Sequence, residues 1–295
     1  MKTLIVEIPE ENRIGELVTV SKAFCEKPDL LVLGEGEVRG SYEKVFSSTE
    51  TVGANLLPSL AGLVEKEGYE VVLFSATAVG GALAGPLAVM VSGVFLSEVT
   101  GVGSDLVLER PVYGAKAVAK YKFEKTPVIL TIRRKYFEKD PLEGTAVATP
   151  LPVEGKVVTF LGEEVEETEG VPLEDAEVIV TGGRGIGAQE NFAMLTEMSH
   201  LLKGAVGASR GAVDEGWMAP QLQIGQTGKI VAPTVYFAIG VSGASQHLAG
   251  ITNAKCVVAI NKDEEANIFN RAQFGIVEDY KKILPALVAA IKAEG

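Results

Sequence analysis

Three turns rich in glycine and serine lie close together in the C-terminal half of the sequence, each beside a short apolar run. They span residues 207–211, 225–228 and 240–243. Glycine carries no Cβ, so main-chain N–H groups in such turns can approach a phosphate or a planar ring, and nearby Ser, Thr, Gln and His side chains supply directional hydrogen bonds. Turns of this kind at the ends of strands indicate a ligand-binding site.

Arg210 is the first candidate for a residue that acts on such a ligand. It lies among small residues in the segment SRG, where a buried guanidinium would need a partner, and Asp214 could supply a structural ion pair. A positive charge beside a planar redox ring would instead stabilise the electron-rich reduced forms of that ring. Both roles are open on the residues alone.

Thr227 in GQTGK and His247 in SQHL are two further candidates for the same site. A hydroxyl and an imidazole can both donate hydrogen bonds to an electron-rich ring. Taken by themselves, the threonine would equally suit a residue that closes a turn, and the histidine one that caps the following helix.

The motif GGRGIG, residues 182–187, follows a predicted strand and opens a predicted helix. Its spacing is not GxGxxG, and the sequence about 20 residues later lacks the acidic residue that binds an adenosine ribose, so a nicotinamide site has weak support. The free N–H groups at the start of the helix and the charge of Arg184 could hold an anion. An exposed arginine in a glycine-rich turn is the alternative.

Other kinds of site have less support. GVSGA at 240–244 lacks the final glycine of a nucleophile elbow, and we interpret His200, one of the two histidines, as structural. No cluster of histidines, cysteines and carboxylates has metal-ligand spacing. Cys25 and Cys256 are far apart, so we expect two buried free thiols. The net charge of −12, without a block of Lys or Arg, argues against a nucleic-acid partner.

Strands and helices alternate along the N-terminal part, which is typical of a parallel sheet with covered faces. Strands are predicted at 3–8, 29–33 and 70–74, and helices at 14–25 and 51–66. Three segments without room for helices between them predict an antiparallel addition at the sheet edge, at 106–109, 114–123 and 127–132. The uncharged stretch 71–97 is interrupted by glycine and proline and flanked by Glu, so we expect strand, helix and strand there rather than a membrane span.

The C-terminal part shows the same alternation, and the chain length allows two domains, which we place at 1–172 and 173–295. The predicted strands are 176–181, 205–208, 229–232, 235–239 and 256–260, and the predicted helices are 189–202 and 280–293, the last interrupted by Pro285. Between the domains we expect a strand and a crossover at 150–172, with the acidic run 163–169 as a solvated face. The N-terminal apolar run is followed at once by acidic residues, unlike a signal or transit peptide, so we expect a cytoplasmic location.

Several of these motifs occur together in a recognisable order: SRGAVD, QIGQTGKIVAP, SGASQHLAG and VAINKD. In this order and spacing they resemble the C-terminal flavin-binding domain of the electron-transfer flavoprotein alpha subunit, and SATAVGG and VYGAKAVAKY extend the resemblance more weakly to the N-terminal part. The resemblance implies an α/β protein of two domains. The first would be a parallel sheet with added antiparallel strands that contacts a beta subunit, and the second a doubly wound domain that binds FAD.

The resemblance also implies roles for individual residues. Arg210 would lie close to the isoalloxazine ring, Thr227 would hydrogen-bond near N5, and His247 would address the O2/N1 edge. The other implied FAD contacts are Arg184, Ser209, Ile224, Gly225, Gln226, Ser242, Gly243, Ala244, Ser245, Gln246, Asn261, Asp279 and Tyr280. Gln273 and Phe274 stand where the family often has Asp-Tyr, so the adenosine end departs from the family pattern.

The implied function is an electron carrier, without small-molecule turnover of its own. It would pass electrons from flavoprotein dehydrogenases, such as the acyl-CoA dehydrogenases of fatty acid oxidation, to a quinone- or ferredoxin-linked acceptor. The implied beta subunit would complete a heterodimer and carry AMP or a second FAD. A nicotinamide-dependent dehydrogenase and a non-catalytic nucleotide-binding module are the alternatives, because doubly wound domains host many functions.

Overall fold

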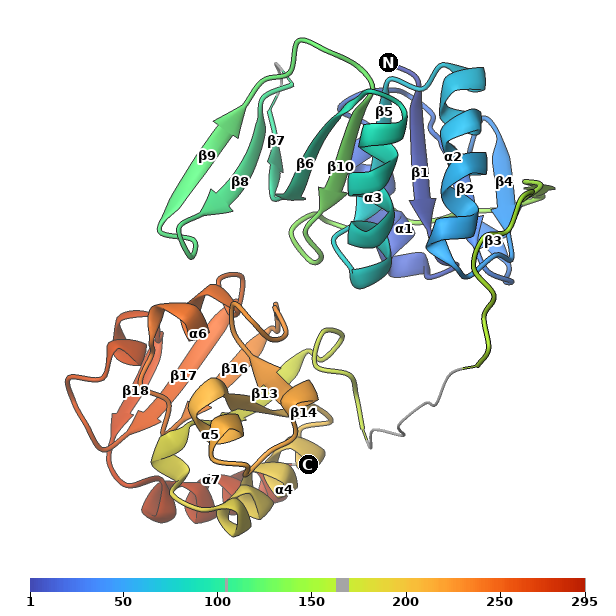
Figure 1. Cartoon of the computed structure of the whole chain (residues 1–295). Helices are drawn as coiled ribbons and strands as arrows, with labels where there is room; N and C mark the ends of the chain where they lie inside the picture. Colours follow the sequence, from blue (N-terminus) through green and yellow to red (C-terminus); the bar gives the residue numbers. More distant parts are fainter. Residues whose placement is uncertain (104–105, 163–169, 295) are drawn as a thin grey trace. The chain divides into compact units, whose positions relative to one another are not determined.

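The computed structural model describes residues 1–103, 106–162 and 170–294 of the chain. The chain divides into two compact units, Met1–Glu164 and Val165–Gly295 (Figure 1). Each contains hydrophobic cores of its own. The acidic run predicted at 163–169 lies outside the described residues.

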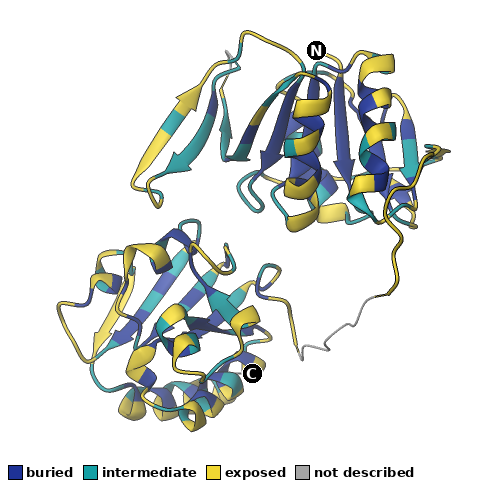
Figure 2. Ribbon diagram, viewed as in Figure 1, coloured by how far each residue is buried: buried dark blue, intermediate teal, exposed yellow. Residues whose placement is uncertain are grey.

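The N-terminal unit is built on a seven-stranded parallel sheet with the strand order β12-β4-β2-β1-β5-β10-β6. Its strands are β1 (Thr3–Glu7), β2 (Asp29–Leu33), β4 (Val45–Ser48), β5 (Val71–Ser75), β6 (Val94–Val99), β10 (Val128–Ile132) and β12 (Thr149–Pro150). Helices α2 (Gly53–Glu67) and α3 (Ala78–Met90) pack on one face, and α1 (Glu11–Ser21) packs on the other. The central strands are buried on both faces, as Figure 2 shows, which accounts for their continuous apolar sequences.

A smaller antiparallel sheet is formed by β7 (Gly101–Val102), β8 (Leu108–Val112) and β9 (Ala117–Tyr121), which confirms the added antiparallel strands. The prediction that 127–132 belongs to it was wrong. This segment is β10, which pairs in parallel with both β5 and β6 in the main sheet. All five residues of β10 are buried. The hairpin β8–β9 occupies the connection where a crossover helix would normally stand, so the order of segments along the chain was misleading.

Two short strands, β3 (Val38–Arg39) and β11 (Thr145–Ala146), pair in a separate antiparallel ribbon and were not predicted. The uncharged stretch 71–97 contains β5, α3 and most of β6, as expected. Within the described residues, the structure contains no helix with the length and apolar character needed to span a membrane.

The C-terminal unit is a six-stranded parallel sheet with the order β15-β14-β13-β16-β17-β18. The strands are β13 (Val178–Gly182), β14 (Ala205–Ser209), β15 (Gln223–Ile224), β16 (Val235–Ile239), β17 (Cys256–Asn261) and β18 (Phe274–Val277). The chain therefore proceeds outward from β13 in one direction and then from β16 in the other. This order confirms the doubly wound fold and places its switch point between β13 and β16.

Residues along β13, β14, β16 and β17 divide between two different cores, so both faces of these strands are covered. Helices α4 (Phe192–Leu201) and α7 (Tyr280–Glu294) pack on one face. The short helix α6 (Ser245–Ala249) and the 3₁₀ turn η4 (Asn267–Asn270) lie over the other. Helix α5 (Arg210–Asp214) follows β14 directly.

Some predicted details of this unit differ from the structure. Residues 229–232 form no strand, and only Lys229 makes an isolated bridge, to Ile224. Helix α7 continues through Pro285, because both Pro285 and Lys281, whose carbonyl loses its helical donor, are exposed to solvent. The two cysteines are free thiols but are partly exposed rather than buried.

Candidate functional site

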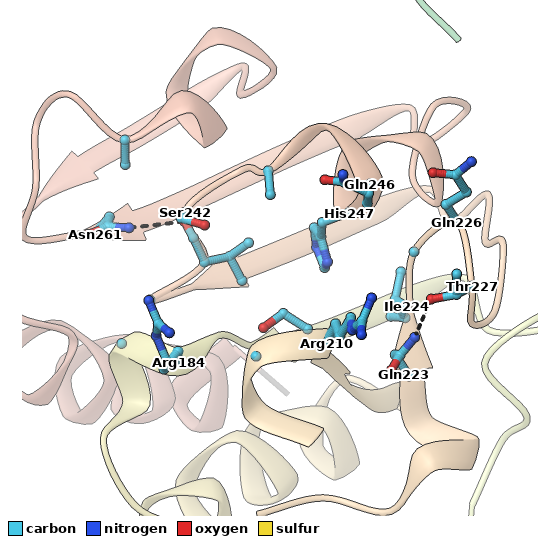
Figure 3. Close-up of a pocket in the computed structure, with 18 of the residues that line it drawn as sticks. Arg184, Arg210, Gln223, Ile224, Gln226, Thr227, Ser242, Gln246, His247 and Asn261 are labelled. Carbon is cyan, nitrogen blue, oxygen red and sulfur yellow. Dashed lines mark hydrogen bonds between the residues drawn. The ribbon is translucent and has the colours of Figure 1, made fainter. Parts of the chain in front are cut away.

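A pocket of about 550 Å³ opens at the carboxyl ends of four strands of the C-terminal unit (Figure 3). Ser209 ends β14, Ile224 ends β15, Gly240 follows β16 and Asn261 ends β17. In open parallel sheets, ligands bind beyond the carboxyl ends of the strands, next to the point where the strand order reverses. The position of this pocket therefore marks it as the binding site of the unit.

Most of the residues predicted from the sequence line this one pocket. They are Arg184, Ser209, Arg210, Ile224, Gly225, Gln226, Thr227, Ser242, Ala244, Gln246, His247 and Asn261. Figure 3 shows Gln246 and His247 descending from α6, Arg184 and Arg210 facing them from the opposite side, and Gln223, Gln226 and Thr227 at one end. Segments that are far apart in the sequence thus converge on a single cavity.

Four predicted residues do not line this pocket. Asp279 and Tyr280 line an adjacent pocket of about 190 Å³, which shares Gly185, Gly240 and Asn261 with the first. An extended ligand could therefore occupy both. Gly243 and Ser245 line neither. At Gly243 the backbone has φ +79° and a Cβ would come 2.2 Å from the amide nitrogen of Ile268, so the position requires glycine. Ser245 is the exposed first residue of α6.

Arg210 is exposed, so it is not the buried guanidinium that would have needed a partner. It is the first residue of α5, so its side chain leaves the end of β14 toward the pocket and not toward the core. Its Nε lies 3.4 Å from a carboxylate oxygen of Asp214, and the two side chains are 69% and 63% exposed. An exposed pair of this kind contributes little to stability, so the guanidinium can turn to a ligand at small cost.

The turn that carries Thr227 is fixed by hydrogen bonds from several directions. Gln223 donates from Nε2 to the Thr227 hydroxyl oxygen at 3.0 Å, which leaves the hydroxyl proton for another acceptor. The amide of Gln226 donates to the carbonyl of Gln246 in α6 at 2.8 Å. The hydroxyl of Thr227 is therefore held as a donor at one end of the pocket.

His247 differs from the other polar residues of the site because it is buried, with only 6% of its surface exposed. Its Nε2 lies 2.9 Å from the hydroxyl oxygen of Tyr236, and its Nδ1 has no hydrogen-bond partner of good geometry among the described residues. Burial lowers the pKa of His247 to about 4, and the nearby backbone of Ile224 opposes this shift only in part. The imidazole is therefore neutral at neutral pH.

The GGRGIG segment does not open a helix, so the predicted anion site at a helix start is not formed. It forms a 3₁₀ turn, η1 (Arg184–Ile186), and α4 begins only at Phe192, after a second 3₁₀ turn, η2 (Gln189–Asn191). The amides of Gly183 and Gly185 donate to carbonyls at the end of β16, so they are not free for a ligand. The exposed side chain of Arg184 lines the pocket and could contact an anion there.

Other lining residues were not predicted individually, although some lie in the predicted turns: Gly185, Gly211, Gln223, Gly240, Val241, Asp263 and Ala266. Gly240 is the most informative. A Cβ there would come 2.9 Å from the carbonyl carbon of Gly185, so the ends of β13 and β16 meet at the switch point without side chains between them. Its position at the end of a predicted strand was visible in the sequence. The sequence did not show that Gly185 would lie against it across the switch point.

The pocket fits a dinucleotide with a planar ring system. Arg184 and Arg210 supply positive charge for phosphates or for an electron-rich ring, and Thr227 supplies a directed donor. At Gly225 the backbone has φ +148°, which favours glycine, and a Cβ there would lie 3.1 Å from the Gln246 carbonyl oxygen. The fold and the pocket together define a doubly wound α/β nucleotide-binding protein.

Comparison with known proteins identifies the family. Residues 172–252 match the electron transfer flavoprotein FAD-binding domain, and residues 49–157 match the electron transfer flavoprotein domain. The chain is 39% identical to the electron transfer flavoprotein subunit alpha of Mycobacterium leprae over 300 residues, which cover 95% of this chain and 93% of that protein. It is 38% identical to the Paracoccus denitrificans subunit alpha (94% and 81% covered) and 40% identical to that of Bacillus subtilis (79% and 74% covered).

The chain therefore belongs to the electron transfer flavoprotein alpha subunit family. FAD is the cofactor of its C-terminal domain. Its role is electron transfer, and as an alpha subunit it has a beta subunit as its partner.

Proposed function

We propose that this chain holds FAD in the pocket of its C-terminal domain and passes electrons between protein partners, without turning over a small substrate. One observation carries the proposal: Arg210, Thr227 and His247, from three separate elements, line one pocket at the switch point of the sheet. FAD, when bound, supplies the redox chemistry. The chain supplies the charge, the hydrogen bonds and the enclosure around it.

We assign different roles to the three residues. The exposed guanidinium of Arg210 adds positive charge, which favours a ring that has gained electrons. The hydroxyl of Thr227, oriented by Gln223, donates a hydrogen bond at the ring edge. His247 contributes a neutral imidazole in a fixed orientation. Together these residues raise the reduction potential of the bound flavin.

The remaining contacts follow from the two adjacent pockets. We propose that the ring end lies in the larger pocket and the adenosine end reaches the smaller one, where Asp279 and Tyr280 lie. Tyr280 is well placed for this, because its hydroxyl donates to the carbonyl of Ile186 at 2.8 Å and so fixes its ring beside the switch point. Gly243 shapes the loop, and Ser245 is the most peripheral of the predicted contacts.

The proposed partners are proteins. A beta subunit carrying AMP or a second FAD would form the heterodimer and contact the N-terminal domain, residues 1–172. Electrons would come from flavoprotein dehydrogenases, such as acyl-CoA dehydrogenases, and leave to a quinone- or ferredoxin-linked acceptor. Exposed apolar residues of the N-terminal unit, including Val147, Val157 and Leu161, support a protein-binding role for this domain. The cytoplasmic location and the link to fatty acid oxidation stay predictions.

The test is to co-express the chain with a candidate beta subunit, purify the complex, and record its absorbance before and after titration with dithionite. We expect a yellow protein that bleaches on reduction and releases FAD in acid. A protein that is colourless, and stays so after incubation with FAD, would overturn the proposal and favour a non-catalytic nucleotide-binding module.

A nicotinamide-dependent dehydrogenase is disfavoured by the structure of the sheet. In such folds the strand next to the first one ends near an acidic residue that binds the ribose. Here that strand is β14, and it ends at Ser209, followed by Arg210. Oxidation of a small substrate by the purified chain with NAD, in the absence of a second protein, would reverse this conclusion.

A further inference from the structure

A buried hydrogen-bonded pair lies behind the wall of the pocket. Tyr236, the second residue of β16, is completely buried, and its hydroxyl oxygen lies 2.9 Å from Nε2 of His247 in α6. The two rings are tilted by 53°, with centroids 6.1 Å apart. Tyr236 lies outside the set of pocket-lining residues, so it acts on a ligand only through its neighbours.

The proton between these two groups can belong to either of them. Tyr236 can donate to Nε2, which places the imidazole proton on Nδ1, or His247 can donate from Nε2 to the tyrosine oxygen. Burial raises the pKa of the Tyr236 hydroxyl and lowers that of His247, so both groups are neutral and an ion pair is excluded. The choice is therefore between two neutral arrangements.

The surroundings decide between them, because each buried proton needs an acceptor. The hydroxyl of Thr181 is completely buried, lies close to the Tyr236 oxygen, and has no hydrogen bond of good geometry among the described residues. If His247 donated to Tyr236, the tyrosine proton would turn to Thr181, whose own proton would then have no acceptor.

The opposite direction pairs the stronger donor, the phenol, with the stronger acceptor, the imidazole nitrogen, and leaves only the Nδ1 proton without a partner of good geometry among the described residues. Thr181 donates to the Tyr236 oxygen, Tyr236 donates to Nε2 of His247, and the remaining imidazole proton lies on Nδ1. The backbone carbonyl of Ile224 is close to the imidazole, and it favours a proton on the ring over a lone pair. The chain of groups links β13, β16, α6 and β15, all of which end at or border the pocket.

We propose that Tyr236, backed by Thr181, is a positioning residue of this site: its hydroxyl donates to Nε2 of His247 and fixes the imidazole as the neutral tautomer protonated on Nδ1. The consequence for FAD rests on the proposed function. With Tyr236 in place, His247 presents one ring orientation and one dipole direction to the pocket. Without the tyrosine hydroxyl, the ring could exchange tautomers and the Ile224 end of β15 would lose its fixed neighbour.

The chain is well suited to a direct test, because it contains only two histidines. The full chain, labelled with ¹⁵N in its histidine rings, is examined by long-range ¹H–¹⁵N NMR at neutral pH. We expect His247 to carry its proton only on Nδ1, whereas His200, exposed at the end of α4, shows the average of both tautomers and serves as an internal reference. A proton on Nε2 of His247 in the wild-type chain would overturn the proposal.

Two isosteric variants complete the test. Tyr236→Phe removes the donor to Nε2, and Thr181→Val removes the group that orients that donor. In both we expect His247 to populate the second tautomer while the His200 signals stay unchanged. A His247 spectrum that is identical to the wild type in both variants would contradict the proposal. Since the measurement needs no cofactor, a chain that failed to bind FAD would refute the proposed function but leave this result standing.

The effect on the cofactor is tested in the heterodimer by a double-mutant cycle. Tyr236→Phe should weaken FAD binding by about tenfold, the size expected for losing one buried hydrogen bond. In a His247→Gln background, the same substitution should change FAD binding much less, because the tyrosine acts through the histidine. Equal effects in both backgrounds would show that Tyr236 supports the fold without positioning His247.

Discussion

The backbone of Gly225 packs directly against the backbone of Gly250: a Cβ added to Gly250 would lie 2.6 Å from the Gly225 Cα. Gly225 opens the turn that carries Thr227, and Gly250 follows the helix that carries His247. Two of the residues assigned to the flavin are thus held together by a contact between main chains. The distance between the turn and the helix is therefore set by backbone atoms alone, because neither Gly225 nor Gly250 has a side chain.

Replacing Gly250 with alanine should therefore weaken both the domain and its cofactor site. The backbone must move to admit the new methyl group, which typically costs about 1–3 kcal/mol. Unfolding in urea, followed by the fluorescence of Trp217, the single tryptophan of the chain, measures the first effect, and an FAD titration measures the second. Gly62→Ala, in α2 with no atom within 4 Å of its Cβ, is the control and should keep wild-type FAD affinity. Wild-type FAD affinity in the Gly250 variant would show that this contact does not position the turn.

Arg210→Ala should lower the reduction potential of the bound flavin while leaving the fold intact. The side chain is 69% exposed and its partner Asp214 is also exposed, so we expect the free energy of unfolding to change by about 0.5 kcal/mol or less. Lys282→Ala, which removes a 71% exposed lysine from a similar pair with Glu278, is the matched control and should leave the potential unchanged. An unaltered redox titration of the Arg210 variant would remove Arg210 from the site.

Thr227 can be tested by separating its hydroxyl from its shape. Thr227→Val keeps the branched side chain but loses the donor that Gln223 orients, so it should lower the reduction potential. Thr227→Ser keeps the hydroxyl and should stay close to the wild type. The residue is exposed, so neither change should alter thermal stability measurably. If the valine and serine variants had the same potential, the hydroxyl would have no part in tuning the flavin.

The buried His247 makes a prediction about acid stability. Burial lowers its pKa from 6.5 to about 4, so between these values the unfolded chain binds a proton that the folded chain does not. The contribution of this group to stability is therefore complete above pH 6.5 and is lost as the pH falls toward 4, by roughly 3 kcal/mol in total. His247→Gln has no such proton, and its unfolding free energy should fall less on acidification, as followed by Trp217 fluorescence. The same pH dependence in both proteins would contradict a buried neutral imidazole.

Much of the fold was predictable because buried parallel strands have distinctive sequences. Short continuous apolar runs such as 29–33 and 235–239 are typical of buried strands, and both are strands in the structure. The errors have a common cause in strand pairing, which depends on the whole chain. The segment 127–132 was correctly predicted to be a strand but was assigned to the wrong sheet. The segment 229–232 is largely apolar, but only Lys229 pairs with the sheet, in a single bridge to Ile224.

In the candidate site, too, local features were predictable from the sequence and contacts between distant segments were not. Glycine-rich turns with polar neighbours revealed most of the pocket, including Arg210 and Thr227, because their chemistry is local. The exposure of Arg210 was not visible, since it depends on where α5 begins. Nor could the sequence show that Tyr236 lies against His247. A tyrosine inside a predicted strand suggests only core packing, and the hydrogen bond exists because α6 folds back over β16.

All the lining residues of the larger pocket, among those the structure describes, lie between Arg184 and Ala266, within the C-terminal unit. The residues of this unit that we propose to tune the flavin, Arg210, Thr227 and His247, are thus encoded in one continuous stretch of the gene. Exchange or duplication of that stretch in evolution would carry all three together.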